Sequence, residues 1–316
     1  MTAAVALSVV IPVFNAEQTL SELAARLANV LSAGDEVIFV EDVGSDGSWD
    51  VIAAVVAEHP TWRGIQLGRN SGQHGALLAG IRAARNPIIV TMDDDLQHRP
   101  EDLPRLLEAL TPATDLVYGV SAVEEHAAGR SLASRLVKRI LRRSLGVSHA
   151  EYISAFRCFR TQLREAFATV NDPYVSIDVL LSWSTSRVTP VSVEMDARAS
   201  GSSGYSFRGL VRHAVNMITG YSAAPLRVVA YLGLLLGALG MGTLTYVLVR
   251  FFLGDTTVPG FTFLASLLSL VGGIQMIGIA VIGEYLARVH FRTMRRPSYF
   301  VRNEVGSNEA GGSHGD

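Results

Sequence analysis

Two long stretches without a charged residue, both in the last third of the chain, constrain the fold most. The first covers 22 residues from Val228 to Val249, and the second covers 23 residues from Phe261 to Gly283. As a helix, each is long enough to cross the roughly 30 Å hydrocarbon core of a bilayer. The alternative is a pair of buried helices in a large soluble core. Because two such runs follow each other directly, we predict a transmembrane hairpin with helices at residues 226–253 and 261–287.

Basic residues flank this hairpin at its two outer ends. They are Arg208, Arg212 and Arg227 before the first run, and Arg288, Arg292, Arg295 and Arg296 after the second. The connecting segment GDTTVPG carries an aspartate and no lysine or arginine, although Arg250 lies near it. Positive flanks stay on the cytoplasmic side of a membrane. The pattern predicts a multi-pass protein of the inner (plasma) membrane, with the domain that precedes the hairpin and both termini in the cytoplasm.

The two ends of the chain and its cysteine content agree with a cytoplasmic location. The start, MTAAVALSVVIPVF, lacks the basic residues of a secretory signal and is typical of a first strand. The single cysteine, Cys158, excludes an internal disulfide framework and is typical of a reducing compartment. The end, NEVGSNEAGGSHGD, is polar and rich in glycine and serine, so we expect it to be disordered.

The first 120 residues alternate short apolar runs with helical stretches. The apolar runs lie at residues 7–14, 35–42, 62–70, 87–95 and 113–120. They are too apolar for strands with one solvated face, so we predict an α/β fold with a Rossmann-like, mainly parallel sheet that helices cover on both sides. Ligands of such sheets bind beyond the carboxyl ends of the strands. Asp42 and Asp93 end two of the runs and are therefore expected on one rim.

Residues 125–225 give weaker signals. EYISAFRCFR contains a candidate strand, YVSIDVLLSWS a buried helix or strand, and VTPVSVEMDAR a strand. FRGLVRHAVNMITGYS has basic residues opposite apolar ones, which is typical either of a helix in the membrane interface or of an ordinary packed helix. We therefore expect a cytoplasmic catalytic domain at 1–204, an interfacial helix at 205–225, the hairpin, and a cytoplasmic tail at 288–316.

The most informative motif is IIVTMDDDLQHRP, residues 88–100, in which three aspartates end an apolar strand. Along an extended backbone Asp93, Asp95 and Gln97 would share one face, with Asp94 opposite. Oxygen ligands of this kind suit Mg²⁺ or Mn²⁺, which usually also bind substrate phosphates. The alternative is an aspartate-rich turn that caps the next helix. A cation would explain why three like charges gather where a buried strand ends.

Two further segments are candidates for binding a nucleotide. In VEDVGSDGSWD, Glu41 and Asp42 close a strand, and an acid there can accept hydrogen bonds from a ribose or base. In LGRNSGQHGALLAG, Arg69 and His74 flank a predicted helix start, where phosphate binds favourably; a plain helix cap is the alternative. Neither GxGxxG nor GxxxxGK[ST] occurs, so dinucleotide and P-loop sites are not supported.

These motifs together resemble the family 2 glycosyltransferases of GT-A fold, in particular the polyprenyl-phosphate glycosyltransferases similar to dolichyl-phosphate mannose synthase and the bacterial GtrB and ArnC proteins. The resemblance covers most of residues 7–290. Its motifs are VVIPVFNAEQTL, VEDVGSDGSWDVI, RNSGQHGALLAGIRAA, MDDDLQHRPEDLP and GEYLARV. The chain departs from the family pattern at Ala16, which moves the glutamate to Glu17, and at Val43–Gly44, where the family has Gly-Ser.

The resemblance implies a role for each candidate residue. Pro12, Asn15, Glu17 and Asp42, with Arg69, His74, Asp93, Asp94 and Arg198, would bind the donor; Asp93, Asp95 and Gln97 would hold Mg²⁺ or Mn²⁺; Arg130 and Arg135 would hold the acceptor phosphate. A solvated basic helix is the alternative for the last two arginines. Asp178, an acid in an apolar run, would orient the acceptor, act as a weak base, or accept a hydrogen bond in the core.

The implied activity is inverting transfer of a hexose from a nucleotide-sugar, with UDP as the expected nucleotide, to a polyprenyl phosphate in the membrane. The product would serve modification of a cell-envelope glycan. The sugar, the prenyl length and the oligomeric state, including a homo-oligomer, stay open, and we expect no nucleic-acid partner. The alternatives are a non-catalytic scaffold that binds nucleotide-sugar, and a processive polysaccharide synthase. The second lacks support because the Q-x-x-R-W motif is absent and a translocation channel needs more than two spans.

Overall fold

The computed structural model describes residues 5–121, 152–170, 175–196, 224–253, 260–294 and 297–306. The chain forms two compact units. The first unit comprises Met1–Ser206 together with Arg295–Asp316, and the second comprises Phe207–Met294. The first unit is thus assembled from both ends of the chain, and the second unit is an insertion within it.

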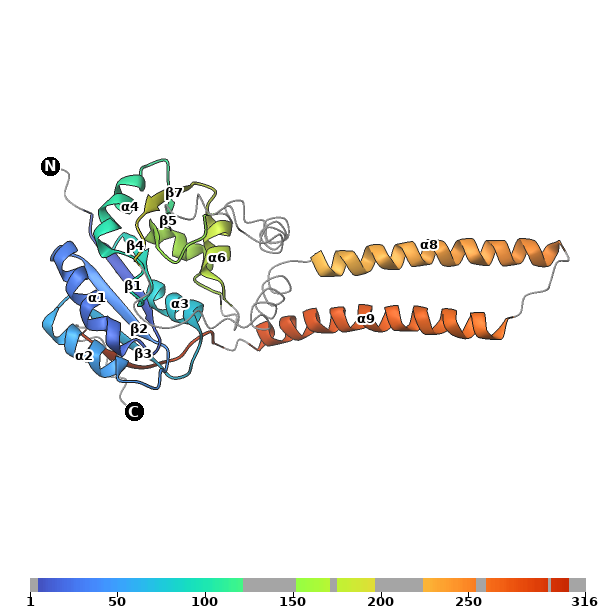
Figure 1. The fold of residues 1–316 in the computed structure, drawn as a ribbon, viewed down its shortest axis with the longest axis horizontal. Helices are drawn as coiled ribbons and strands as arrows, with labels where there is room; N and C mark the ends of the chain where they lie inside the picture. The colour runs from blue at the N-terminus through green and yellow to red at the C-terminus, as the bar shows by residue number, and fades with distance from the viewer. Residues whose placement is uncertain are drawn as a thin grey trace. The chain divides into compact units, whose positions relative to one another are not determined.

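A single mixed sheet organises the described residues of the first unit (Figure 1). Its strands are β1 (Leu7–Val13), β2 (Glu36–Glu41), β3 (Arg63–Leu67), β4 (Ile88–Thr91), β5 (Leu116–Ser121), β6 (Arg157–Arg160), β7 (Val188–Val193) and β8 (Val301–Val305). The order across the sheet is β7-β5-β6-β4-β1-β2-β3-β8. The four adjacent strands β4, β1, β2 and β3 run parallel to one another, and β5 runs parallel to β7. β6 is antiparallel to β4 and β5, and β8 is antiparallel to β3.

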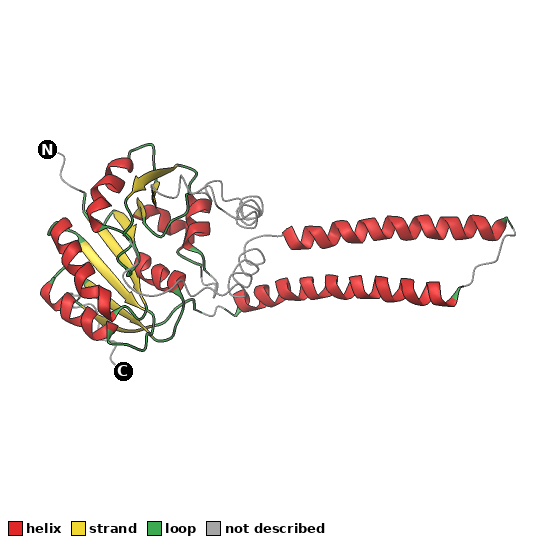
Figure 2. Cartoon of the chain, viewed as in Figure 1, coloured by secondary structure: helices red, strands yellow, loops and turns green. Residues whose placement is uncertain are grey.

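Helices cover both faces of this sheet, as Figure 2 shows. The helical elements are α1 (Glu17–Val30), α2 (Ser48–Glu58), α3 (Gln73–Ala83), η1 (Pro100–Asp102), α4 (Leu103–Ala109), η3 (Thr161–Phe167) and α6 (Ile177–Ser184). Along β1, Val9 and Ile11 pack into one core with α1, α2 and α4, whereas Val10 packs into the opposite core with α3, η3 and α6. Successive strand residues face opposite sides, so an uninterrupted apolar run is what a doubly covered strand needs.

The predicted mainly parallel α/β fold is confirmed. All five apolar runs of the first 120 residues contain a strand, and EYISAFRCFR and VTPVSVEMDAR contain β6 and β7. The segment YVSIDVLLSWS, for which a helix and a strand were both open, forms helix α6. Most of the expected interfacial helix at 205–225, all but its last two residues, and residues 307–316 lie outside the described residues.

The C-terminal tail is where the prediction was wrong. Val301–Val305 form β8 against the edge strand β3, so the expected disorder does not begin at Asn303, and the first unit does not end at residue 204. Residues 288–293, assigned to the tail, belong to a helix. The physical reason is that β3 would otherwise leave an unpaired edge, which attracts a strand even of modest hydrophobicity. The polar composition of this segment gave no indication that it would pair as a strand.

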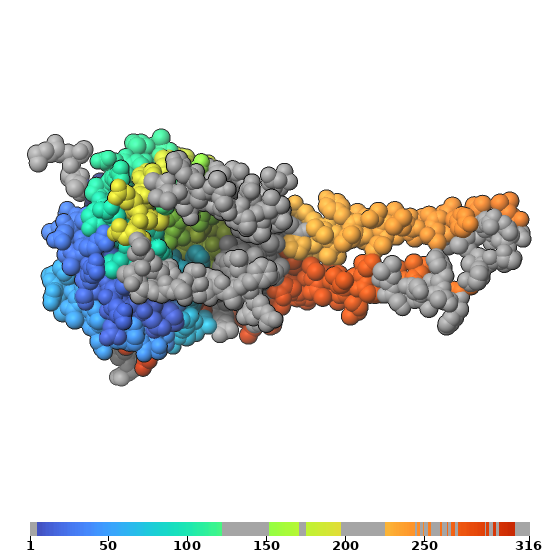
Figure 3. All heavy atoms as spheres, in the orientation of Figure 1, coloured from blue at the N-terminus to red at the C-terminus, as the bar shows by residue number. Residues whose placement is uncertain are grey.

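The second unit consists, in its described part, of α8 (Ala224–Phe252) and α9 (Phe261–Thr293). Large apolar side chains of both helices are exposed, Leu234 and Ile277 among them. Figure 3 shows both helices with all their atoms, coloured by position in the chain. The helices approach each other at Gly278, where an added Cβ would lie 3.3 Å from Val229 Cγ1. Among the described residues, one stretch, Pro225–Thr243, is long and apolar enough to cross a membrane, and the apolar stretch Val271–Ala287 of α9 is shorter.

Candidate active site

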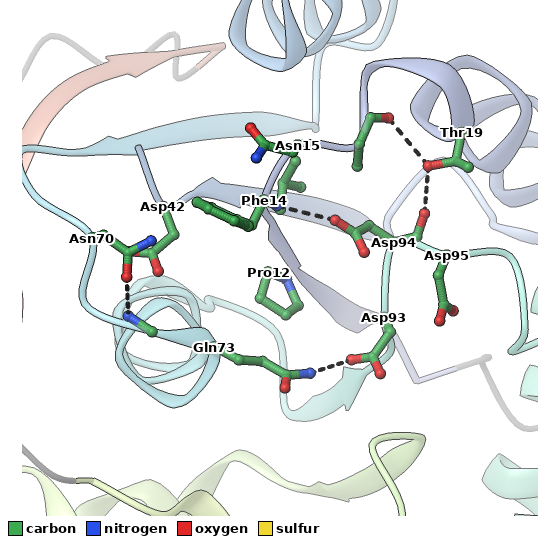
Figure 4. Close-up of a pocket in the computed structure, with 13 residues that line it drawn as sticks. Pro12, Phe14, Asn15, Thr19, Asp42, Asn70, Gln73, Asp93, Asp94 and Asp95 are labelled. Atoms are coloured by element: carbon green, nitrogen blue, oxygen red, sulfur yellow. Dashed lines mark hydrogen bonds between the residues drawn. The ribbon is translucent and has the colours of Figure 1, made fainter. Parts of the chain in front are cut away.

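A cavity of about 470 Å³ opens at the carboxyl ends of the central parallel strands (Figure 4). Its lining comes from the end of β1, the loops after β1, β2, β3 and β4, and the first turns of α1 and α3: Pro12, Val13, Phe14, Asn15, Ala16, Thr19, Asp42, Asn70, Gly72, Gln73, Asp93, Asp94 and Asp95. The four loops meet because parallel strands present their carboxyl ends at the same edge of a sheet. The prediction that Asp42 and Asp93 share one rim is confirmed.

The loop after β1 is connected to both neighbouring loops by hydrogen bonds. Asn15 has a positive φ of 53°, and its side-chain oxygen accepts a hydrogen bond of 2.7 Å from the Ser45 amide. On the other side, the Phe14 amide donates to Asp94 Oδ2 at 3.1 Å, and Thr19 Oγ1 donates to the Asp94 carbonyl at 2.6 Å. Asn15 tolerates the left-handed conformation better than other residues, which explains an asparagine at this turn.

Asp42 forms the floor of the cavity beside β2. Its amide donates to the Val13 carbonyl at 2.9 Å, and its Oδ1 accepts a hydrogen bond of 2.6 Å from the Ser71 amide. The side chain is buried, and burial raises the pKa of Asp42, although the amides of Ser71 and Gly72 oppose that shift. A buried carboxylate in the lining of a cavity can accept a hydrogen bond from a donor group of a ligand.

Glu17 lies outside the cavity lining, although the sequence predicted it at the donor. Its Oε2 accepts a hydrogen bond of 3.0 Å from the Gly47 amide, and its own amide donates to Asp46 Oδ2 at 3.0 Å. Ser48, at the start of α2, donates to Asp46 Oδ1 at 2.7 Å. These contacts join the starts of α1 and α2. Glu17 therefore supports the cavity indirectly, by holding the starts of these two helices together.

Three aspartates, Asp93, Asp94 and Asp95, line the side of the cavity next to β4, and we call them the acidic rim. Figure 4 shows Gln73 reaching across the cavity to Asp93, where its Nε2 donates to Oδ1 at 2.6 Å. The Asp93 amide donates to His98 Nδ1 at 3.2 Å, and burial lowers the pKa of His98, which favours the neutral ring that can accept this bond.

The expected single face of Asp93, Asp95 and Gln97 is wrong. Leu96 has a positive φ of 64°, which breaks the extended run, and Gln97 does not line the cavity. Instead the Gln97 amide donates to Asp95 Oδ1 at 3.1 Å, and its carbonyl accepts from the Asp196 amide at 3.0 Å. All three aspartates face the cavity because the chain turns, a feature that strand periodicity cannot express.

The electrostatics of the acidic rim favour a cation. Burial raises the pKa of Asp93, and it raises the pKa of Asp94 to about 7, with the like charges of its two neighbours adding to the shift. Within the described ranges, no three histidine, cysteine, aspartate or glutamate side chains are arranged to hold a metal by themselves. Mg²⁺ and Mn²⁺ commonly use one or two carboxylates and complete their shell with water and substrate phosphates. The rim fits an ion of that kind, which Asp95 and Asp93 could hold.

Asp178 lies away from the cavity, in a buried ion pair with Arg157 that we call the buried pair. Arg157 Nε and Nη2 donate to the two oxygens of Asp178 at 2.7 and 2.9 Å, and Tyr118 donates to Oδ1 at 3.1 Å. Although burial opposes ionisation, the charge of Arg157 lowers the pKa of Asp178. Of the three roles left open, the geometry matches a hydrogen-bond acceptor in the core. Both carboxylate oxygens bond to Arg157, and Asp178 does not line the cavity.

Arg69 and His74 also lie outside the lining of the cavity. Arg69 donates to the carbonyls of Pro297 and Ser298 at 2.8 and 3.5 Å, and His74 Nδ1 accepts from the Ile177 amide at 3.4 Å. Arg130, Arg135 and Arg198 lie outside the described residues. The sequence reasoning missed Phe14, Thr19, Asn70 and Gln73 as lining residues. Only their position next to predicted strand ends could have indicated them.

Comparison with known proteins gives concordant results. The model of the family described as Glycosyl transferase family 2 matches residues 8–167. The undecaprenyl-phosphate 4-deoxy-4-formamido-L-arabinose transferase of Aeromonas hydrophila is 32% identical over 307 residues, covering 95% of this chain and 94% of the relative. The protein of the same name from Yersinia pestis is 31% identical over 96% of this chain and 94% of its own length.

A solved structure shares the fold at much lower identity. Glucosyl-3-phosphoglycerate synthase from Mycobacterium tuberculosis, in complex with Mn²⁺, UDP and glucosyl-3-phosphoglycerate, superposes with a TM-score of 0.51 at 16% identity. The match covers 69% of this chain and 78% of that one. It supports the GT-A type of α/β fold for the first unit.

Proposed function

Because this chain belongs to glycosyl transferase family 2 and is a glycosyltransferase, we propose that it transfers one sugar from a UDP-sugar to a polyprenyl phosphate, with inversion, at the cytoplasmic face of the membrane. One observation carries the proposal. A cavity with an acidic rim lies at the carboxyl edge of the sheet, in a chain that matches undecaprenyl-phosphate sugar transferases over 95% of its length. That match extends through the apolar helices α8 and α9.

The donor would occupy the cavity between Asp42 and the acidic rim. Asp42 and Asn15 would bind the nucleoside, and Asp95 with Asp93 would hold Mg²⁺ or Mn²⁺ against the diphosphate. When bound, such an ion neutralises the charge that develops on the leaving nucleotide. The synthase with the shared fold was solved with Mn²⁺ and UDP, which agrees with this class of ligand.

The chain's own residues would act mainly by positioning. An acceptor phosphate is already ionised near neutral pH, so its attack on the anomeric carbon needs no strong general base. The engagement of Asp178 by Arg157 agrees with a mechanism that does not use this acid as a base. Arg130 and Arg135 are proposed to hold the acceptor phosphate and Arg198 the donor diphosphate, because guanidinium groups bind phosphate through paired hydrogen bonds.

The apolar helices would place the reaction at the membrane surface. Helices α8 and α9 expose their large apolar side chains, which water would disfavour and lipid would accept. We propose that both cross the bilayer, that both termini lie in the cytoplasm, and that residues 205–225 lie in the interface. A prenyl chain would then remain in the bilayer while its phosphate reaches the enzyme.

One reconstitution tests the proposal. Purified full-length protein is incubated with Mn²⁺, undecaprenyl phosphate and a panel of UDP-sugars, and the lipid product is weighed by mass spectrometry. We expect one donor to give a lipid carrying one sugar, with UDP released only when the prenyl phosphate is present. Release without lipid, or no product with any donor, would contradict the proposal; a ladder of sugars would indicate a processive synthase. Binding of UDP-sugar without turnover would favour the scaffold.

A further inference from the structure

Strand β8 comes from the far end of the sequence and contacts a loop of the cavity. That loop, residues 68–72, connects β3 to α3 and contributes Asn70 and Gly72 to the lining. The contacting segment, residues 297–306, contains β8 and follows α9 in the chain after three intervening residues. We call it the return segment. Its contacts with the 68–72 loop all lie within the first unit.

Backbone carbonyls of the return segment accept hydrogen bonds from the 68–72 loop. The Gly68 amide donates to the Phe300 carbonyl at 2.8 Å. Arg69 Nη2 donates to the Pro297 carbonyl at 2.8 Å and to the Ser298 carbonyl at 3.5 Å. Charged donors make the stronger class of hydrogen bond. The Arg69 guanidinium is therefore engaged by the return segment, and Arg69 does not line the cavity.

Glycines let the return segment approach this closely. An added Cβ at Gly64 would lie 2.8 Å from Val305 Cγ2, and one at Gly68 would lie 2.6 Å from Phe300 Cδ1. Gly306 has a φ of +88°, and a Cβ there would overlap the Val56 side chain and the Trp62 carbonyl. Glycine in a strand often marks such a close approach of another backbone. The return segment therefore packs so closely against its neighbours that larger side chains at these glycine positions would collide.

The 68–72 loop in turn holds the floor of the cavity. The Ser71 amide donates to Asp42 Oδ1 at 2.6 Å, and the Gly72 amide, which also contributes to Asp42, donates to Asn70 Oδ1 at 3.2 Å. Because backbone amides of this loop orient the Asp42 carboxylate, the position of the carboxylate depends on the position of the loop. A chain of contacts therefore runs from the return segment through the loop to Asp42.

We propose that the return segment is a positioning element of the donor site: it holds the 68–72 loop, and through Ser71 the Asp42 carboxylate, in the geometry that donor binding requires. Arg69 is a positioning residue that acts through the carbonyls of Pro297 and Ser298. The effect on donor binding rests on the proposed function, whereas the ordering of the loop does not. The residues after the apolar hairpin are therefore part of the catalytic unit and not a dispensable tail.

Hydrogen–deuterium exchange on the full-length chain tests the ordering directly. Gly306→Ala disturbs the return segment at the end of β8 remote from the cavity, and Arg69→Met removes the guanidinium while keeping the apolar stem. We expect peptides covering 67–75 and 297–306 to exchange roughly tenfold faster in both variants, while a peptide covering α1 keeps its protection. Gly34→Ala is the matched control, because its added Cβ meets only Ala6 Cβ, at 3.8 Å.

Steady-state kinetics supply the second measurement. Gly306→Ala should raise KM for the UDP-sugar by about tenfold and leave KM for the prenyl phosphate unchanged. The inference is overturned if the return segment exchanges faster while peptide 67–75 keeps wild-type protection, or if neither segment responds in either variant. Absence of glycosyl transfer with every donor would contradict the proposed function and leave the exchange result standing, so the two failures are distinguishable.

Discussion

The acidic rim and the buried pair place the same type of side chain in opposite circumstances. Asp93, Asp94 and Asp95 gather at the cavity, and burial raises the pKa of the first two. Asp178 is buried more deeply, yet Arg157 lowers its pKa. A carboxylate paired with a cation in the core can stay ionised there, whereas like charges gathered at a cavity favour binding of an external cation. Burial alone therefore does not separate a structural acid from a functional one; the local partner does.

Backbone strain shows the same division. The non-glycine residues with positive φ in the described parts of the chain are Asn15, Val43 and Leu96. Each lies in a loop after a parallel strand, next to or in the wall of the cavity. Strained conformations persist where the surrounding structure enforces them, and they concentrate at functional sites. The region around Arg157 and Asp178 relies on paired charges and standard backbone geometry.

Breaking the buried pair should have the largest effect. Arg157→Met leaves Asp178 as an unpaired buried charge, which should lower the free energy of unfolding by about 3–5 kcal/mol. Denaturant unfolding of the purified protein measures this change. The double variant Arg157→Met/Asp178→Leu should recover most of the loss, because it removes both charges. Equal stability of the single variant and the wild type would contradict a structural role for the pair.

Neutralising the acidic rim should affect turnover and spare the fold. We expect Asp95→Asn to lower kcat on the order of 100-fold, because the ion on the diphosphate loses a charged ligand. Its unfolding midpoint should stay close to that of the wild type, because the substitution removes one of three clustered like charges and keeps the shape of the side chain. Asp50→Asn, at an exposed aspartate of α2 outside the lining, is the control. Wild-type turnover by Asp95→Asn would refute the metal assignment.

The raised pKa of Asp94 should appear in the pH dependence of stability. Its shift from 3.8 to about 7 means that the folded, metal-free protein binds a proton more tightly than the unfolded chain does. The contribution of Asp94 to stability therefore falls as pH rises through this window. The free energy of unfolding that Asp94→Asn gains over wild type should be larger at pH 8 than at pH 4, by on the order of 1 kcal/mol. Thermal unfolding of both proteins with a chelator present, across this pH range, measures the difference. The same pH dependence of stability in both proteins would contradict the prediction.

The smallest expected effect is relief of strain at Val43. This β-branched residue has a φ of 57°, a conformation that asparagine adopts at lower cost. Val43→Asn should raise the free energy of unfolding by about 1 kcal/mol. Calorimetry of wild type and variant measures the shift. The corresponding change at Val120, whose backbone is standard, should give no such gain, and a destabilised Val43→Asn would show that the Val43 side chain contributes packing.

The parallel core and the acidic rim could be predicted because both depend on local sequence. Apolar runs bounded by helices identify strands, and an acid at the end of a run identifies the functional edge. The role of Asp178 could not be predicted, because its partner Arg157 is 21 residues away and other arginines of the chain were equally available. Arg69 was predicted to bind phosphate. Its partners in the structure are backbone carbonyls 228 and 229 residues further along the chain, which local sequence could not indicate.

The sequence by itself determined the family, the α/β fold, the position of the acids at one edge of the sheet, and the apolar character of the C-terminal helices. All of these follow from short-range patterns, since strand period, helix period and charge-free length are properties of neighbouring residues. Only the tertiary structure decided which acid faces the cavity, which acid has an arginine, and which strand closes the sheet. Those outcomes depend on contacts between residues far apart in the chain, and folding alone brings such residues together.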